Sequence, residues 1–216
     1  MTPAKRAMDV IVAALLGLIL VVPLACLMLV LLLAEGRPVL YLSERMAAPG
    51  RPFRLIKLRT MRPAPDSGGV TGGDKSARMS RLHRLLRRSR ADEIPQLWNV
   101  LRGDISLVGP RPPLRIYVED YPDLYARVLR SRPGITGLAT LRYADHEERL
   151  LARCRTAAET DATYRRRCIP RKARLDLIYQ RRRSIAMDLC LVWETALRPI
   201  RGRRLARDMG NKAKNR

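Results

Sequence analysis

The sequence predicts a helix-rich α+β protein with an N-terminal re-entrant membrane helix hairpin bent at a proline. Interfacial amphipathic helices and a small domain with a short β-hairpin are expected to follow. Three features predict this fold: a long uncharged run, two short strand candidates after it, and apolar residues at helical spacing further on. A chain of 216 residues suffices for one globular domain with an appendage. We expect a membrane segment over 1–36, a domain over 37–200 and a basic, disordered tail over 201–216.

The uncharged run covers residues 10–34. As a helix it reaches roughly 37 Å, enough to cross the apolar core of a bilayer. Lys5 and Arg6 precede the run and a strongly basic chain follows it, so both flanks favour the cytoplasmic side and indicate a hairpin. Pro23 lacks an N–H and crowds the carbonyl of Ile19, which gives a bend a physical cause. A single span kinked at Pro23 is the alternative.

The strand candidates cover residues 39–42 and 53–58, with a turn at Pro49 and Gly50 between them. This pattern predicts a small β-hairpin just outside the membrane. The next stretch, 62–80, is rich in Gly, Pro and Ser, and we expect a loop there.

Apolar residues three and four positions apart, with arginines elsewhere, predict an amphipathic basic helix over residues 76–90. Such a helix lies in a membrane interface or covers a core. A short helix from Pro95 is expected to end at Gly103, where glycine suits the C′ position. Two further helices are expected over 146–168 and 171–200.

The charge balance restricts the partners. With 43 Lys and Arg against 20 Asp and Glu, the net charge of +23 predicts anionic partners such as nucleic acid, phospholipid headgroups or phosphorylated small molecules. Aromatic residues make up 5% of the chain, too few for the stacking surfaces of most single-strand binders, so we expect no nucleic acid partner. The tail is expected to meet anionic membrane lipids. The four cysteines form no disulfide framework or zinc motif.

A pair of carboxylates, Asp92 and Glu93, stands out in this basic chain. One interpretation is structural: one acid caps the helix that begins at Pro95, and the other is solvated. The second is functional: an ionised carboxylate beside a bound phosphate acts as a nucleophile. That arrangement requires compensating cations, for which Arg87, Arg111 and a divalent metal are candidates. The spacing alone leaves both interpretations open.

The stretch RSRADEIPQLWNVLRGDISLVGPRP resembles the signature of the bacterial sugar transferases, the polyprenyl-phosphate hexose-1-phosphate transferases. Three further stretches fall in the order of that family: FRLIKLRTM from Phe53, RPGITGLA from Arg132, and LDLIYQRRRSIAMDLCLVWET from Leu175. The similarity spans nearly the whole chain and includes Lys5 and Asp9 before the apolar run. A match this long is specific.

The resemblance implies an enzyme at the cytoplasmic face of the bacterial inner membrane. It would move a sugar 1-phosphate from a UDP-sugar to undecaprenyl phosphate and release UMP, which initiates exopolysaccharide, capsule, O-antigen or glycoconjugate synthesis. In that family the first acid forms a covalent phosphosugar intermediate with Mg2+ assisting, so the resemblance makes Asp92 the nucleophile and Glu93 its partner, both near the metal. It also implies a membrane helix that re-enters at its proline.

The resemblance further implies phosphate binding by Lys57, Arg59, Arg87, Arg111 and Arg132, and structural roles for Pro23, Pro110 and Pro112. The chain departs from the family pattern at Val22, Ala91 and Thr140 and over 143–170. These departures leave the sugar, the pathway and the oligomeric state open. They also motivate the alternative of a catalytically inactive membrane scaffold with the same fold.

Overall fold

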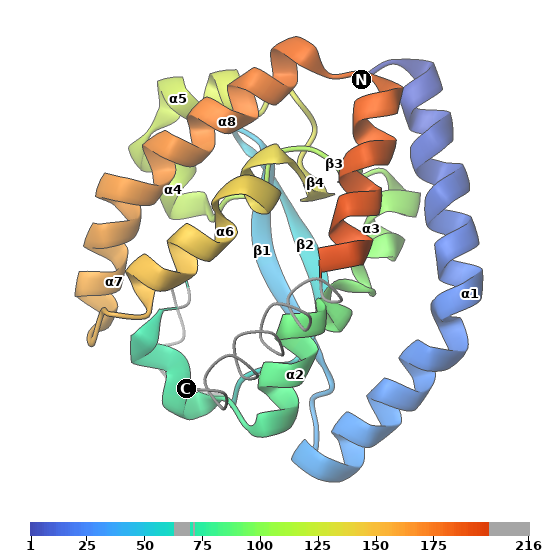
Figure 1. The fold of residues 1–216 in the computed structure, drawn as a ribbon, viewed down its shortest axis with the longest axis vertical. Coiled ribbons are helices and arrows are strands. Elements are labelled where there is room, and N and C mark those ends of the chain that lie inside the picture. The colour runs from blue at the N-terminus through green and yellow to red at the C-terminus, as the bar shows by residue number, and fades with distance from the viewer. Residues whose placement is uncertain (63–69, 71, 199–216) are drawn as a thin grey trace, which may run out of the picture.

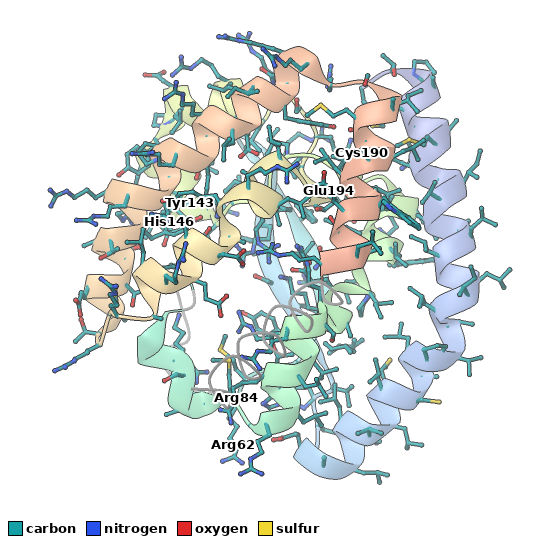
Figure 2. The ribbon with its side chains drawn as sticks, in the orientation of Figure 1. Arg62, Arg84, Tyr143, His146, Cys190 and Glu194 are labelled. Carbon is teal, nitrogen blue, oxygen red and sulfur yellow. The ribbon has the colours of Figure 1, made fainter. Side chains whose placement is uncertain are left out.

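The computed structural model describes residues 1–62, 70 and 72–198. Its first element is the helix α1, Pro3–Glu35, which continues through Pro23. Figure 1 shows α1 along one side of the molecule, with a change of direction in its lower part. By length and composition α1 could cross a membrane, and only 6% of its most apolar window is buried. Figure 2 shows side chains projecting from the outer side of α1, away from the other elements.

The N-terminal end of α1 is bound to the domain by buried polar contacts. The Lys5 ammonium lies 2.6 Å from the carboxylate of Asp188. Asp9, fully buried, accepts hydrogen bonds from the Ser106 hydroxyl at 2.7 Å and from the Leu107 N–H at 3.3 Å. These contacts account for the polar residues that precede the apolar run in the sequence.

The C-terminal end of α1 is bound to the same domain. The guanidinium of Arg59 donates to the carbonyls of Glu35 at 2.7 Å, Gly36 at 2.9 Å and Arg37 at 3.0 Å. These carbonyls lie where a helix leaves its acceptors without internal partners. Arg59 therefore fixes the position at which the chain leaves α1.

The predicted β-hairpin is confirmed and is longer than expected. Strands β1, Leu40–Ala48, and β2, Arg51–Leu58, pair antiparallel. The turn falls at Pro49 and Gly50, and Gly50 adopts a positive φ of 70° that suits a residue without a Cβ. The hairpin lies at the centre of Figure 1.

A second, parallel pair of strands was not predicted. It joins β3, Ser106–Val108, to β4, Gly134–Thr136. The two segments of backbone approach so closely that a Cβ on Gly134 would lie 2.3 Å from the backbone nitrogen of Gly109. Strands of three residues are too short to show a period-2 pattern in the sequence.

The helices and helical turns of the domain have the following bounds: 3-10 turn η1, Gly73–Arg78; α2, Arg81–Ser89; 3-10 turn η2, Ala91–Glu93; α3, Gln96–Arg102; α4, Arg115–Asp120; α5, Pro122–Val128; α6, Leu138–Leu151; α7, Ala157–Thr163; π-helix η3, Tyr164–Cys168; and α8, Ile169–Arg182. A further helix covers 185–198.

Three expectations about helices were wrong in extent. The stretch 146–168 is not one helix, because α6 ends at Leu151 and α7 begins after Thr156, whose hydroxyl accepts from the Glu159 N–H at 3.1 Å. The stretch 171–200 is interrupted at 183–184. The basic amphipathic helix begins only after Ser80, which caps α2, and is preceded by η1.

Buried apolar residues join the domain to both halves of α1. Ala13 packs in one cluster with Val100 and Ile105. Leu31 packs in another with Leu58 and Leu86, which belong to β2 and α2. The two clusters hold α1 against the elements that carry Lys57 and the carboxylate pair.

Parts of the predictions lie outside the described residues: segments 63–69 and 71 of the expected loop, and the expected tail 201–216. Within the described residues, no group of three or more His, Cys, Asp and Glu is arranged to hold a metal ion. The four cysteines are free thiols.

Candidate active site

The carboxylate pair lies in the short turn η2 between α2 and α3. Arg90, in the left-handed conformation with φ 59°, ends α2 and reverses the chain. Asp92 and Glu93 follow, and each is only 8% exposed. Neither acid caps α3, since that helix begins after Pro95 without a side-chain cap. The structural interpretation of the pair as a helix cap is therefore wrong.

Three cations hold Glu93. Its Oε1 lies 2.8 Å from Arg111 Nη2 and 3.5 Å from Lys57 Nζ, and its Oε2 accepts from Arg90 Nε at 3.1 Å. Burial alone would raise the pKa of Glu93, but Arg111, Arg90 and Lys57 outweigh it and hold the pKa well below its usual value. The ion pairs of Glu93 thus join β2, η2 and the loop after β3.

Asp92 differs from its neighbour. Within the described part of the chain its carboxylate makes no hydrogen bond and no ion pair within 4 Å, and it lines two adjoining cavities. Burial and the adjacent Glu93 raise its pKa, while Lys57 and Arg87 oppose that shift. Asp92 therefore keeps its lone pairs available to a bound molecule, as a nucleophile requires.

The cations beside Asp92 are only partly neutralised. Burial and the nearby Arg111 lower the pKa of Lys57 to about 7. Burial also lowers the pKa of Arg87, which Asp92 partly offsets. A buried excess of positive charge is relieved by an anion, so a phosphate bound here would be stabilised and would restore the charge on Lys57.

The loop that carries Arg111 is held by the hairpin. Pro110 and Pro112 bracket Arg111, the carbonyl of Pro112 accepts from Arg45 at 3.4 Å, and the carbonyl of Pro113 accepts from the Met46 N–H at 3.1 Å. Arg45 was not predicted, and one arginine among many in a basic chain gave no signal in the sequence. Its contact explains how the prolines and the hairpin together position Arg111.

The structure brings together Lys57, Arg87, Asp92, Glu93 and Arg111. Arg59 only reaches the margin of one cavity, because its guanidinium is engaged at the end of α1. Arg132 lies outside both cavities, near Gly103 at the end of α3. A Cβ added to Gly103 would lie 3.6 Å from a guanidinium nitrogen of Arg132. The phosphate-binding roles expected of Arg59 and Arg132 stay predictions without support from their placement.

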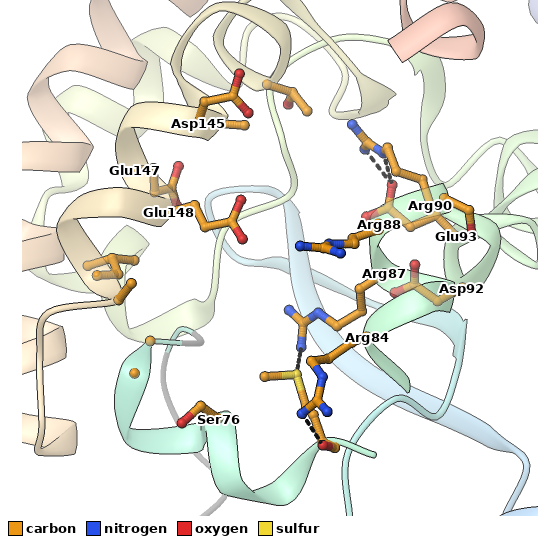
Figure 3. A pocket seen from close by; sticks show the side chains of 18 of the residues that line it. Ser76, Arg84, Arg87, Arg88, Arg90, Asp92, Glu93, Asp145, Glu147 and Glu148 are labelled. Carbon is orange, nitrogen blue, oxygen red and sulfur yellow. Dashed lines mark hydrogen bonds and ion pairs between the residues drawn. The ribbon is translucent and has the colours of Figure 1, made fainter. Parts of the chain in front are cut away.

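Two cavities meet at Asp92. The larger is a cleft of about 1830 Å³ between α2 and α6. Figure 3 shows its walls: arginines of α2 on one side and carboxylates of α6 on the other. The labelled members are Arg84, Arg87 and Arg88 on α2, and Asp145, Glu147 and Glu148 on α6.

The smaller cavity, of about 520 Å³, lies between the hairpin, α4, α5 and α8. It is lined by tyrosines from four elements: Tyr41, Tyr117, Tyr125 and Tyr164. Both cavities are lined by the same six side chains where they meet: Lys57, Arg87, Asp92, Arg111, Glu147 and Lys172. A molecule in one cavity therefore reaches the same carboxylate as a molecule in the other.

Asp176 on α8 is a buried carboxyl in the smaller cavity. It is 7% exposed and, within the described residues, has no hydrogen bond or ion pair. Burial raises its pKa to about 7, and Lys172, one turn earlier on α8, opposes the shift. Sequence reasoning missed this residue because an aspartate in an amphipathic helix is ordinarily solvated.

Asp176 should make stability depend on pH. Its folded-state pKa lies above the unfolded value of 3.8, so its contribution is full below pH 4 and falls until about pH 7. Between pH 5 and pH 8, we expect the wild type to lose about 3 kcal/mol of unfolding free energy relative to Asp176→Asn. Thermal unfolding of both proteins in detergent at the two pH values measures the difference. Equal pH dependence in the two proteins would show that Asp176 is not desolvated.

Comparisons with known proteins point to one family. The family model described as bacterial sugar transferase matches residues 1–202. Over 166 residues the chain is 41% identical to a UDP-glucose:undecaprenyl-phosphate glucose-1-phosphate transferase of Caulobacter vibrioides, covering 73% of this chain and 61% of the relative. Over 198 residues it is 32% identical to a UDP-N-acetylgalactosamine-undecaprenyl-phosphate N-acetylgalactosaminephosphotransferase of Aeromonas hydrophila, covering 88% and 42%. The chain thus matches about three fifths of the first relative's length and less of the second's.

Proposed function

Because the chain belongs to the bacterial sugar transferase family, we propose that it transfers a sugar 1-phosphate from a UDP-sugar to undecaprenyl phosphate and releases UMP. The observation that carries the proposal is the division of roles in the carboxylate pair. Glu93 is neutralised by three cations, whereas Asp92 has no ion pair within the described residues and lies among cations that suit a diphosphate. The names of the two relatives describe transfer of sugar phosphates to the same lipid carrier.

We propose two displacement steps at one phosphorus atom. An oxygen of Asp92 attacks the phosphorus that bears the sugar, and the bond to the UMP oxygen breaks, so that UMP leaves with the electron pair. An oxygen of undecaprenyl phosphate then attacks the same phosphorus and releases the Asp92 carboxylate. The lipid product carries a diphosphate bearing the sugar, and the side chain returns to its initial state.

Lys57, Arg87 and Arg111 support both steps. Each lines the junction of the cavities beside Asp92. Fixed cations in a site shielded from water stabilise the charge that develops on the leaving phosphate, without reorganisation during the reaction. Arg111 is additionally oriented by its ion pair with Glu93, which gives Glu93 a positioning role.

The carboxylate of Asp92 fits Mg2+. This ion takes oxygen ligands and is usually held by one or two carboxylates together with substrate phosphates and water. In the described part of the chain Asp92 offers oxygens without a hydrogen bond, whereas both oxygens of Glu93 face Arg90, Arg111 and Lys57, so Glu93 would bind the ion only by exchanging one of these contacts. Bound there, Mg2+ would neutralise diphosphate charge.

We propose that α1 enters the membrane and returns to the cytoplasmic face. Both of its ends are bound to the same domain, one through Lys5 and Asp9 and the other through Arg59. A straight crossing would put the two ends on opposite sides of the membrane and break one of these sets of contacts. The apolar side chains between the ends are exposed, and lipid is the environment that would cover them. The basic charge of the chain favours anionic lipid headgroups.

The helix of 185–198 and α3 extend this membrane-facing surface. Ile185, Leu189 and Trp193, spaced four residues apart, are 44%, 48% and 66% exposed, and Trp98 on α3 is 57% exposed. Tryptophan favours the level of lipid headgroups, and an apolar face of this kind is typical of an interfacial helix. We therefore propose that both helices lie in the membrane interface.

Cysteine labelling tests the topology. In a variant without the native cysteines, we expect Ala7→Cys and Arg37→Cys, both at exposed positions flanking the apolar run, to react only from the cytoplasmic side of sealed inverted and right-side-out vesicles. Reaction of the two positions from opposite sides would show that α1 spans the membrane.

UMP release tests the proposed function. Purified protein in detergent with Mg2+ and undecaprenyl phosphate is offered a panel of UDP-sugars, and release of UMP from one of them identifies the donor. A folded protein that releases UMP from no donor in a broad panel would favour the inactive scaffold.

A further inference from the structure

The smaller cavity has a feature that the proposed steps do not use. Asp176 is a carboxyl that is 93% buried without a hydrogen bond or an ion pair in the described residues. A buried polar group without a partner is destabilising, and residues that break this rule are usually functional. The missing partner would be a hydrogen-bond donor on a bound molecule.

The cavity joins cations to a carboxyl and tyrosines. Lys57 and Arg111 lie at the junction beside Asp92, and Lys172 lies one helical turn before Asp176 on α8. Tyr125 is a near neighbour of Asp176: burial, Tyr164 and Asp176 together raise the pKa of its hydroxyl. A ligand that fits the cavity is anionic where it meets Lys57 and Arg111 and carries hydrogen-bond donors where it meets Asp176.

The tyrosines form one wall of the cavity. Tyr117 and Tyr164 have ring centroids 5.0 Å apart, and both line the cavity. Their rings are already engaged by cations, with Arg165 over Tyr117 and Lys172 over Tyr164, each 5.0 Å from the ring centroid. Lys172 also donates to the Tyr164 hydroxyl at 3.2 Å, so this wall is held in place before a ligand binds.

The two substrates differ in what they could offer Asp176. The isoprenoid chain of undecaprenyl phosphate has no hydrogen-bond donor, so placing it here would leave the carboxyl unpaired. Uridine has two ribose hydroxyls and an imide N–H, and carboxylates are the usual partners of a ribose hydroxyl in nucleotide sites. A cavity of about 520 Å³ also falls within the range of small-molecule sites.

We propose that the smaller cavity binds the nucleoside half of the sugar donor, with Asp176 accepting hydrogen bonds from uridine and the cleft between α2 and α6 left to the sugar and the lipid acceptor. This inference rests on the proposed function for the identity of the donor. It assigns Asp176 to substrate binding rather than to the transfer step.

Equilibrium binding of radiolabelled UMP and uridine to detergent-purified protein tests the inference without turnover. We expect Asp176→Asn to weaken both about tenfold, and Asp176→Leu to weaken both up to about a hundredfold, as for loss of a hydrogen bond to a charged group. The control Glu119→Gln changes an exposed carboxylate that lines neither cavity and should bind like wild type. Melting of Asp176→Asn at pH 8 at or above the wild-type temperature excludes unfolding as the cause.

Two results would overturn the inference: unchanged binding of UMP and uridine in both variants, or a raised KM for undecaprenyl phosphate with nucleotide binding intact. The second would make the cavity the acceptor compartment. Failure of the proposed function looks different. If wild type binds uridine, the Asp176 variants lose that binding and no UDP-sugar is turned over, the nucleoside site stands and the transferase activity does not.

Discussion

Asp92→Asn is expected to abolish UMP release, with a loss of at least about 10⁴-fold in kcat, because an amide cannot form the phosphosugar intermediate. The substitution preserves size and removes a carboxylate that makes no ion pair within 4 Å in the described structure. We therefore expect the melting temperature to stay the same or rise, since the pKa of Asp92 is already raised by burial.

The measurement is UMP release with a saturating UDP-sugar, with Glu119→Gln as the control for purification and detergent. Because the variant remains folded, the lost activity can be assigned to the reacting carboxylate. Retention of most of the wild-type rate by Asp92→Asn would remove Asp92 from the role of nucleophile.

Lys5→Met is expected to destabilise the protein by about 3–5 kcal/mol, because it leaves two buried carboxylates without their cation. Lys5 lies 2.6 Å from Asp188 and 3.7 Å from Asp9, and these two acids are 1% and 0% exposed. Asp188 also accepts from the hydroxyl of Tyr179 at 2.7 Å, so the network joins α1, α8 and the helix of 185–198. Its loss should release the N-terminal end of α1 from the domain.

The matched variant is Lys5→Met with Asp188→Asn. Asparagine keeps an acceptor for Tyr179 and removes one negative charge, so we expect it to recover a large part of the lost stability. Thermal unfolding in detergent, followed by circular dichroism, compares the three proteins. If Lys5→Met alone melts like wild type, Lys5 is not required to compensate the charge of the buried acids.

The sequence predicted the elements whose signals are local. The long apolar run and the turn at Pro49 and Gly50 are each contained in a short stretch, and α1 and the hairpin follow them. Gly103 ends α3 as its position indicates, with φ 88°. The break at 183–184 is also local in origin, since the Ser184 hydroxyl accepts from the Met187 N–H at 3.1 Å and caps a new helix. The arginine-rich pattern around it concealed that cap.

The rest depends on contacts between distant residues. The pairing of β3 with β4 joins segments too short to show a pattern. The carboxylate pair stands out in the sequence, but its division of roles depends on Lys57 and Arg111, which come from other elements. Charge alone could not separate Arg111 from Arg132, because both are arginines next to prolines and only the fold places one of them beside Glu93.

The central claim is that Asp92 carries the phosphosugar between the two substrates. Intact-protein mass spectrometry tests it most directly, with purified protein mixed with its UDP-sugar and Mg2+ in the absence of undecaprenyl phosphate. We expect a mass increase equal to one sugar phosphate in wild type, its disappearance when undecaprenyl phosphate is added, and no adduct in Asp92→Asn. An enzyme that releases UMP only when the lipid is present, with no adduct under any condition, would contradict the claim and indicate direct transfer between the substrates.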